Sequence, residues 1–241
     1  MAIDRVDDEQ TLEVLRTGEI EVLGLLPYSS NYTFLARVAS SETLAVYKPR
    51  RGERPLWDFP HGSLAGREAA AYVVSEAGGW AIVPPTVLRE DAPLGPGSLQ
   101  LFVEHDPERH YFTLMEERAE DLVAFAAFDV VINNADRKSG HVIEDGDGRL
   151  WAVDHGVTFH LEDKLRTVIW AYAGLPLDPV TITRLETLGA SLAEPGGLGT
   201  TLEALLTPAE VAATLARTEA LLVEGHFPQP PADRPLPWPL V

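Results

Sequence analysis

The sequence predicts an α+β fold of two lobes, a β-rich N-terminal lobe at about 1–103 and a helical C-terminal lobe at about 104–227. Alternating apolar runs gather in the first region and helical spacing prevails in the second, without the strand–helix alternation of a parallel sheet. The length of 241 residues suits one such domain. The Pro-rich segment 228–241 is expected to be irregular, either binding a partner or lying as a strap along the helical lobe.

Composition narrows the function classes. The chain has 19 Lys and Arg against 37 Asp and Glu, a net charge of -18, which repels nucleic acid and anionic lipid. It has no cysteine, which excludes disulfides, thiolate metal sites and palmitoylation. No apolar run approaches the roughly 20 residues of a membrane span, and the N-terminus has no apolar signal core. We therefore expect a cytoplasmic protein with no nucleic-acid partner and no stable membrane anchoring.

The N-terminal lobe is predicted to consist of strands around one helix. Two alternating apolar runs, 32–38 and 44–48, flank a small polar turn and predict a β-hairpin. Residues 64–77 have helical spacing and good helix formers, and Gly78-Gly79 ends that helix. A weaker helix and three extended runs are expected at 8–17, 20–24, 82–88 and 99–103.

The C-terminal lobe begins with an apolar helical segment at 119–133, followed by a polar cluster at 134–140. Asp145-Gly146-Asp147-Gly148 is a strong turn signal and predicts a second hairpin. Thr207-Pro208-Ala209-Glu210 is a capping box with Pro at the first helical position, so a helix begins there. The other expected elements are strands at 141–143 and 150–153 and helices at 179–193 and 208–223.

Several polar residues occur in an order that suits phosphoryl transfer, which needs a cation on the phosphates and an acid to orient that cation. Lys48 ends a hairpin strand and can reach phosphate oxygens, or it is an ordinary solvated lysine. Glu68 lies among small residues and can pair with Lys48, or it is a first-turn glutamate favoured by the helix dipole. Ser29, Ser30 and Asn31 let backbone N–H groups approach a phosphate, although an ordinary turn explains them equally well.

The same reaction needs a carboxylate facing the acceptor hydroxyl and oxygen ligands for a metal ion. Asp136 lies in a polar loop after an apolar helix and can accept a hydroxyl proton, unless it merely builds a turn. Arg137 beside it can hold phosphate or balance charge. Asp154 ends a strand and suits a metal ligand. His141 is a second candidate ligand, although imidazole suits Mg²⁺ less well than oxygen does, and a buried histidine bonded to the backbone is the alternative.

In this order the motifs resemble those of the type II phosphatidylinositol 4-kinases and, more loosely, the lipid-kinase-like superfamily that includes HipA-type bacterial kinases. The chain is also similar to a group of actinobacterial proteins related to these lipid kinases. The resemblance runs from about 27 to 177. Its main stretches are the Ser-Ser-Asn loop at 29–34, the lysine strand at 44–50, the glutamate helix at 68–72, a hinge-like run at 100–104, Asn-Ala-Asp-Arg at 134–137 and Asp-His-Gly within 152–159.

The resemblance implies a protein-kinase-like fold of the atypical, lipid-kinase type, with ATP and either Mg²⁺ or Mn²⁺. The family pattern has Asn where this chain has His141, and the palmitoylated cysteine cluster of the eukaryotic enzymes is absent. The implied roles are catalysis by Asp136 and Arg137, nucleotide binding by Ser29, Ser30, Asn31, Lys48 and Glu68, adenine binding by the backbone of Gln100 and Val103, and metal binding by Asp154 and His141.

These residues favour an ATP-dependent phosphotransferase acting on an unidentified, soluble hydroxyl acceptor, either a protein or a small molecule. A nucleotide-binding pseudokinase that serves as an interaction module is the alternative, because His141 departs from the pattern and the phosphate loop has no glycine run. A phosphatidylinositol kinase is less favoured because of the acidic charge. A metal-dependent hydrolase using His141, Asp154, His155 and His160 would leave the lysine and the helix glutamate unexplained.

Overall fold

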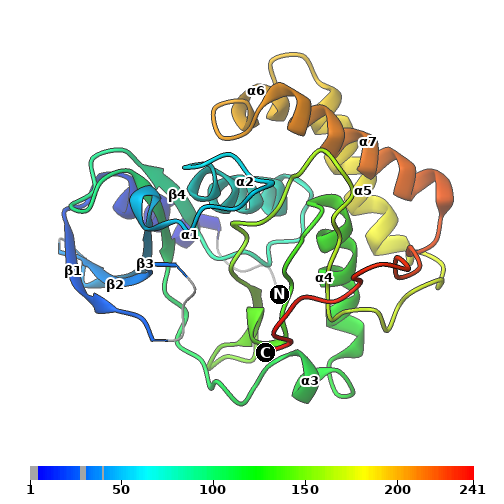
Figure 1. The fold of residues 1–241 in the computed structure, drawn as a ribbon, viewed down its shortest axis with the longest axis horizontal. Coiled ribbons are helices and arrows are strands. Elements are labelled where there is room, and N and C mark those ends of the chain that lie inside the picture. The colour runs from blue at the N-terminus through cyan, green and yellow to red at the C-terminus, as the bar shows by residue number, and fades with distance from the viewer. Residues whose placement is uncertain (1–4, 28–30, 40) are drawn as a thin grey trace.

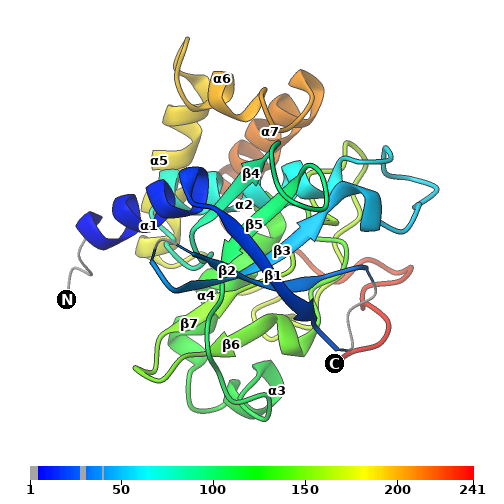
Figure 2. The same ribbon diagram turned by 90° about the vertical axis from the view of Figure 1, so that its left-hand side faces the viewer.

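The computed structural model describes residues 5–27, 31–39 and 41–241, and it confirms an α+β fold with a sheet lobe and a helical lobe (Figure 1). The sheet lobe holds a five-stranded antiparallel sheet in the order β1-β2-β3-β5-β4. Seen from the sheet side, these strands cross in front of the helices (Figure 2). The strands and two helices of this region are α1 (Arg5–Thr17), β1 (Ile20–Leu25), β2 (Phe34–Val38), β3 (Thr43–Pro49), α2 (Leu64–Ala77), β4 (Thr86–Arg89) and β5 (Gly97–Leu101).

The predicted hairpin is β2 and β3, and its alternation places Lys48. Ala45 and Tyr47 of β3 are fully buried, so the side chains of Val46 and Lys48 project to the other face of the sheet. Lys48 lies opposite Ser98 of β5. A Cβ at neighbouring Gly97 would be 2.4 Å from the Lys48 carbonyl oxygen, so β5 approaches β3 closely there only because residue 97 is glycine.

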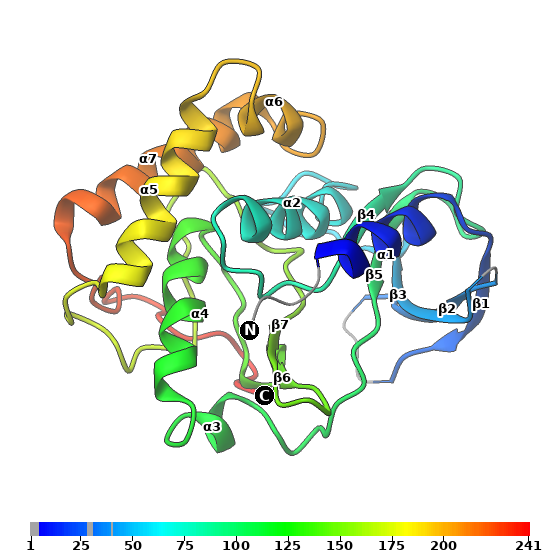
Figure 3. The ribbon, with the colours of Figure 1, turned by 180° about the vertical axis from the view of Figure 1, so that it is seen from behind.

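Helix α2 lies between the sheet and the helical lobe (Figure 3). It spans the predicted residues and ends at Gly78, whose N–H donates to the Val74 carbonyl. Most of its residues are buried, because the helix is covered on several sides. Gly66 permits the closest contact, since a Cβ there would lie 2.6 Å from the Leu205 backbone oxygen. The helix that carries Glu68 is therefore held by both lobes.

The helical lobe follows the predicted order and adds two short helices. The helix α7 begins with the expected capping box, in which Glu210 N donates to Thr207 Oγ1 at 3.3 Å and Thr207 N donates to Glu210 Oε2 at 2.9 Å. Helices α3 and α6 were not predicted, because four or five residues are too few to show a helical period. The elements are α3 (Tyr111–Leu114), α4 (Ala119–Val131), β6 (Val142–Glu144), β7 (Leu150–Ala152), α5 (Pro179–Ala193), α6 (Leu198–Leu202) and α7 (Pro208–Glu224), with β6 and β7 antiparallel and 3₁₀ turns at Arg50–Gly52 and Ser139–His141.

The C-terminal segment is a strap. It leaves the end of α7 and runs back to the centre of the molecule, where the C-terminus lies beside the β6–β7 hairpin (Figure 1). Its backbone is tied at two points, because Pro235 O accepts from Thr167 N at 3.2 Å and Leu240 O accepts from Ser139 N at 2.8 Å. Of the two expectations for this segment, the strap along the helical lobe is the one observed.

A continuous hydrophobic cluster joins the lobes, running from Tyr47 and Leu99 in the sheet through Val74 of α2 to Phe128 of α4 and Leu185 of α5. Because the core continues through α2, the lobes are packed against each other rather than merely tethered. Within residues 5–27, 31–39 and 41–241, none of the helices combines the length and the apolarity that crossing a bilayer requires.

Candidate active site

The structure brings Lys48 together with two acids from distant parts of the chain. Its Nζ donates to a carboxylate oxygen of Glu68 on α2 and, at 2.8 Å, to Oδ1 of Asp154 in the segment after β7. Burial alone would lower the pKa of Lys48, but the two carboxylates outweigh it and raise that pKa, so the ammonium is charged at neutral pH. Lys48 of the sheet lobe thus forms ion pairs with one acid on α2 and with a second acid in the segment after β7.

Glu68 is the buried member of this group, with a side chain only 4% exposed. Its second oxygen accepts from His155 N at 2.9 Å, so both oxygens have partners. Burial raises the pKa of the Glu68 carboxyl, and the charge of Lys48 opposes the rise. Glu68 therefore fixes two things at once, the position of the lysine and the backbone that carries Asp154.

Asp154 is the accessible acid. Its side chain is 48% exposed, and its φ of +60° lies in the left-handed region, which aspartate tolerates better than most residues. Burial would raise its pKa, but Lys48 and His141 outweigh this and hold it well below its usual range. An ionised, exposed carboxylate beside a strained backbone is suited to binding a hard cation.

His141 contacts Asp154, with Nε2 3.3 Å from Oδ2. Burial lowers the pKa of His141 to about 4, and the ring is therefore neutral at pH 7. Its Nδ1 accepts from Lys138 N at 3.4 Å, which leaves the proton on Nε2, pointing to Asp154. In this arrangement His141 orients the metal-binding acid, and a direct bond from Nε2 to a metal requires that proton to move.

Asp136 lies in the loop 134–140, here called the Asp136 loop. The loop is braced internally, since Asp136 N donates to Asn134 Oδ1 and Asn134 Nδ2 donates to Asp129 Oδ1, both at 3.0 Å. The Asp136 carboxylate is 31% exposed and pairs with Lys138 at 3.0 Å. Burial raises its pKa, with Lys138 opposing. A carboxylate of raised pKa that still reaches solvent can accept a proton from a bound hydroxyl.

Of the two roles predicted for Arg137, phosphate contact and charge balance, its placement fits charge balance. Its side chain is fully buried, and it pairs with Asp129 at 2.9 Å. Its other guanidinium protons go to the carbonyls of His141 and Val153, at 3.1 and 3.0 Å, and to His155 Nε2 at 2.9 Å. Because its donors are used inside the protein, Arg137 positions the Asp136 loop against the segment that leads from β7 to Asp154.

The other residues predicted to bind the nucleotide do not join the Lys48 cluster through any of the contacts described below. Ser29 and Ser30 lie outside the described residues, whereas Asn31 accepts from Arg54 N at 2.9 Å. Gln100 lies in β5, which has β3 on one side and β4 on the other, so its backbone groups face neighbouring strands rather than an open hinge. Val103 lies beyond the strand, with its carbonyl accepting from His105 Nδ1 at 2.9 Å. Of the two residues predicted to bind adenine, Val103 has the backbone that is less enclosed by neighbouring strands.

Sequence reasoning missed the residues that support the site. Asp129, fully buried in α4, accepts from Asn134, Arg137 and Thr167, the last at 3.0 Å. A single acid within the apolar stretch 122–131 of α4 was the available signal, because such a group is buried only when it is paired. Lys138 was missed as well, although its spacing of two from Asp136 places both in one short loop.

The structure does not bring together the metal ligands that the hydrolase alternative requires. His155 is buried against Arg137, and His160 Nε2 bonds to the Asp58 carbonyl at 2.9 Å while its ring meets Phe59 edge-on. Across the described ranges, His, Asp and Glu side chains form no group of three that could hold a metal ion. Two ligands suffice for a kinase metal, since phosphate oxygens and water supply the rest.

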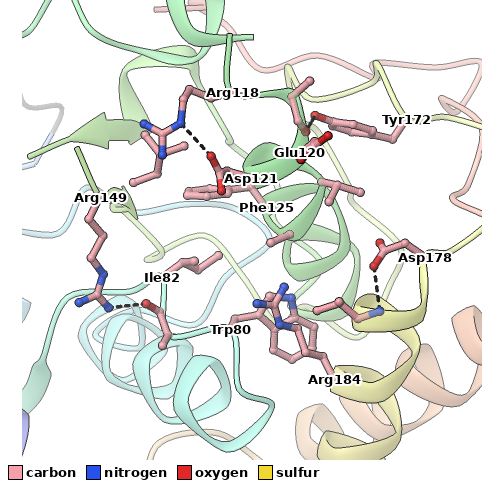
Figure 4. Close-up of a pocket in the computed structure, with 16 residues that line it drawn as sticks. Trp80, Ile82, Arg118, Glu120, Asp121, Phe125, Arg149, Tyr172, Asp178 and Arg184 are labelled. Carbon is pink, nitrogen blue, oxygen red and sulfur yellow. Dashed lines mark hydrogen bonds and ion pairs between the residues drawn. The ribbon is translucent and has the colours of Figure 1, made fainter. Parts of the chain in front are cut away.

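A cavity larger than the one beside Asp136 lies elsewhere in the molecule. It measures about 1040 Å³ and lies between α4, β7 and the start of α5 (Figure 4). None of the predicted site residues lines it. Its arginines are engaged, since Arg118 pairs with Asp121 at 2.7 Å and Arg149 donates to the Ala81 carbonyl at 2.6 Å. Cavity size therefore does not locate the site, whereas the convergence on Lys48 does.

No protein-family model matches the sequence. Protein Rv2133c of Mycobacterium tuberculosis is 39% identical over 276 residues, an alignment that covers 99% of this chain and 98% of that protein. The chain belongs to the Rv2133c family. This Rv2133c-family chain is also 29% identical over 218 residues to phosphatidylinositol 4-kinase gamma 4 of Oryza sativa subsp. japonica, covering 75% of the chain but only 38% of the rice protein.

Solved structures of kinases share the fold. The Golgi casein kinase matches with a TM-score of 0.63 at 17% identity, over 92% of this chain and 75% of that one. The same kinase with Mn/ADP bound matches at 0.60 and 16%, over 92% and 76%. The Helicobacter pylori proinflammatory kinase CtkA matches at 0.51 and 10%, over 88% and 94%. The Rv2133c-family chain thus has a kinase-like fold, as the predicted fold class requires.

Proposed function

We propose that the chain is an ATP-dependent phosphotransferase that uses Mg²⁺ or Mn²⁺ and phosphorylates a hydroxyl group of a soluble acceptor. One observation carries the proposal. Lys48, Glu68 and Asp154 meet in a kinase-like fold, and Asp136 lies on the loop that Arg137 fastens to the strand before Asp154. Phosphoryl transfer depends on positioned charge more than on covalent chemistry, and these groups supply that charge.

Each residue has a defined role in this reaction. Lys48 neutralises phosphate oxygens of the donor, and Glu68 keeps the ammonium in place. Asp154 is the accessible oxygen ligand for the metal ion, which when bound offsets the negative charge of the triphosphate. His141 and Lys138 lie beside the two carboxylates and hold their orientation. The ionised state of Asp154 fits a hard divalent cation, as its depressed pKa indicates.

In the transfer itself, the acceptor hydroxyl oxygen forms a bond to the γ-phosphorus. The bond between that phosphorus and the oxygen bridging to the β-phosphate breaks, and ADP leaves with the electron pair. The hydroxyl proton passes to the carboxylate of Asp136. A general base of this kind contributes about 10²–10⁴-fold to the rate.

Two similarities support parts of the proposal. One solved neighbour of this fold holds Mn/ADP, which favours a nucleotide and a divalent metal here. The name of the rice relative states phosphatidylinositol as its substrate. For this chain a lipid acceptor is less favoured, because a net charge of -18 opposes docking on an anionic bilayer.

The test compares two variants that the proposal separates. Asp136→Ala is expected to lower transfer of labelled γ-phosphate about 10²-fold or more while nucleotide affinity stays nearly constant. Lys48→Ala is expected to weaken both. Asp147→Ala, in the exposed β6–β7 turn, is the matched control and should change neither. Equal loss of nucleotide binding in the two site variants would contradict the assigned roles, and absence of hydrolysis, autophosphorylation and transfer to cell extract would end the catalytic claim.

A pseudokinase remains the second candidate because His141 directs its Nε2 proton to Asp154. This function predicts nucleotide binding without turnover. Saturation at 100 times Kd stabilises the folded chain by about 2.7 kcal/mol, which raises Tm by roughly 5–11 °C in a chain of this size. If ATP gives that shift but no phosphate is released, and His141→Asn then restores release, the natural chain is a binding module.

A further inference from the structure

A second cavity lies directly beside Asp136. It measures about 430 Å³ and is lined by Ala135 and Asp136, by Arg166 and by residues 234–238 of the C-terminal strap. Small-molecule sites commonly have about 300–1,000 Å³. The cavity therefore has room for a small acceptor, next to the carboxylate that receives its proton.

The charges of this cavity favour an anion. Arg166 and Arg234 both line it, and neither forms an ion pair or a side-chain hydrogen bond within the part of the chain that the structure describes. The acid at the cavity, Asp136, already pairs with Lys138 at 3.0 Å. The charge of Arg166 also acts on the Asp136 carboxylate and lowers its pKa, against the effect of burial. In a chain of net charge -18, the two guanidinium groups form a local positive site that attracts anions to this point.

Backbone hydrogen bonds fix Arg166 beside the Asp136 loop. Arg166 N donates to Asn134 O at 2.8 Å, and Arg166 O accepts from Arg137 N at 3.0 Å. The next residue, Thr167, donates its N–H to Pro235 O at 3.2 Å. The same short segment thus binds the Asp136 loop on one side and the strap on the other.

The strap brings Arg234 to the lining of the cavity. Its anchors at Pro235 and Leu240 flank residues 236–238 of the cavity lining, and Arg234 directly precedes the first anchor. The second anchor, Leu240 O, accepts from Ser139 N of the Asp136 loop. Arg234 has a φ of +50°, an uncommon conformation for a residue with a side chain, and it marks where the strap turns at the cavity. Trp238 is 87% exposed at the rim, where a ligand can contact its ring.

We propose that this cavity is the acceptor site and that Arg166 and Arg234 select an alcohol carrying a phosphate or carboxylate group. The proposal rests on the phosphotransferase function for its donor. The acceptor hydroxyl gives its proton to Asp136 and takes the γ-phosphoryl group as ADP leaves, while the anionic group stays on the arginines. Guanidinium groups suit this task because their paired N–H donors match two oxygens of one anion.

Binding of the acceptor is measured without nucleotide, by calorimetric titration of the full chain with glycerol 2-phosphate, glycerate and uncharged glycerol. A parallel arm uses vesicles of phosphatidylglycerol, with phosphatidylcholine vesicles as reference, to distinguish a free compound from a lipid headgroup. The expected order is binding of the anionic compounds and none of glycerol. Arg166→Gln with Arg234→Gln should weaken anion binding at least about tenfold, as expected when charge-assisted hydrogen bonds are lost.

Two further variants keep the result interpretable. Arg166→Lys with Arg234→Lys retains the charges, so it should fold and bind with an intermediate loss. Arg16→Gln, at an exposed position of α1, should leave binding unchanged. Anion binding that is insensitive to the arginine pair, or no anion binding in either arm, overturns the proposal. Arginine-dependent binding in a chain that never turns over ATP would refute the kinase function instead and leave this site standing.

Discussion

The ion pair between Arg67 of α2 and Glu210 of α7 gives the sharpest stability prediction. Both side chains are nearly buried, at 2% and 8% exposure, and Arg67 also donates to the Thr158 carbonyl. The pair fastens the glutamate helix to the helical lobe, one residue away from Glu68. Replacing Glu210 with Gln removes the charge but keeps a side chain that can close the capping box with Thr207.

Removing one partner of a buried pair costs about 3–5 kcal/mol, because the other charge is left without compensation. Arg67 would keep its bond to Thr158 and its contact with the Phe59 ring, 4.9 Å from the centroid, so the lower end of that range applies. For a chain of this size, about 3 kcal/mol corresponds to a Tm decrease of roughly 6–12 °C. Urea unfolding and calorimetry measure both quantities.

The pH dependence gives a second readout of the same variant. Burial would raise the pKa of Glu210, but hydrogen bonds from Thr207 and the charge of Arg67 outweigh it and lower that pKa below 4.5. A depressed carboxyl pKa contributes stability above the unfolded value, and this contribution is lost as pH falls through the folded value. The natural chain should therefore lose stability below about pH 4.5 more steeply than Glu210→Gln does.

Glu203→Gln, an exposed acid before the same helix, is the control and should stay within about 0.5 kcal/mol of the natural chain. A Tm decrease of less than about 2 °C for Glu210→Gln, or an unchanged acid limb, would refute the reasoning that this buried pair joins the lobes.

Two further predictions concern the packing around the site. Asp129→Ala should destabilise the chain by about 3–5 kcal/mol, because it leaves the buried charge of Arg137 without its partner. Its control is Asp121→Ala, which breaks an exposed pair with Arg118 and should cost about 1 kcal/mol or less. Equal urea midpoints for the two variants would contradict this prediction. Gly66→Ala gains about 1 kcal/mol of helix propensity but brings a Cβ within 2.6 Å of Leu205 O, and overpacking of about 1–3 kcal/mol should prevail. Gly146→Ala, which meets open space, is its control, and a higher Tm for Gly66→Ala would show that α2 can shift.

Local signals predicted most of the fold. The bounds of α2 followed from its small residues and from Gly78, and α7 followed from the Thr207 capping box, because caps and periodicity are encoded within a few residues. The path of the strap did not follow, since Pro-rich sequence states only that the segment is irregular. Its course depends on acceptors such as Pro235 O meeting donors nearly seventy residues earlier.

The sequence predicted the site where ionisable residues could be recognised by their type and by their order along the chain. Lys48, Glu68 and Asp154 stood out by residue type and order, and they meet. For Arg137 the sequence left two roles open, holding phosphate or balancing charge, and it could not show that the partner of Arg137 would be the buried Asp129. Adenine binding by the backbone of Gln100 stays a prediction. The local sequence could not show that β5 lies between β3 and β4, because sheet order depends on distant strands.

The most direct test of the central claim is a crystal structure of the full chain with a non-hydrolysable ATP analogue and Mn²⁺. The account predicts phosphate oxygens within hydrogen-bond distance of Lys48 Nζ, the metal on Asp154, and the γ-phosphate facing Asp136 and the cavity beside Arg166. A nucleotide seated in the larger cavity beside Arg118 and Arg184, with Lys48 still clasped between Glu68 and Asp154, would contradict it.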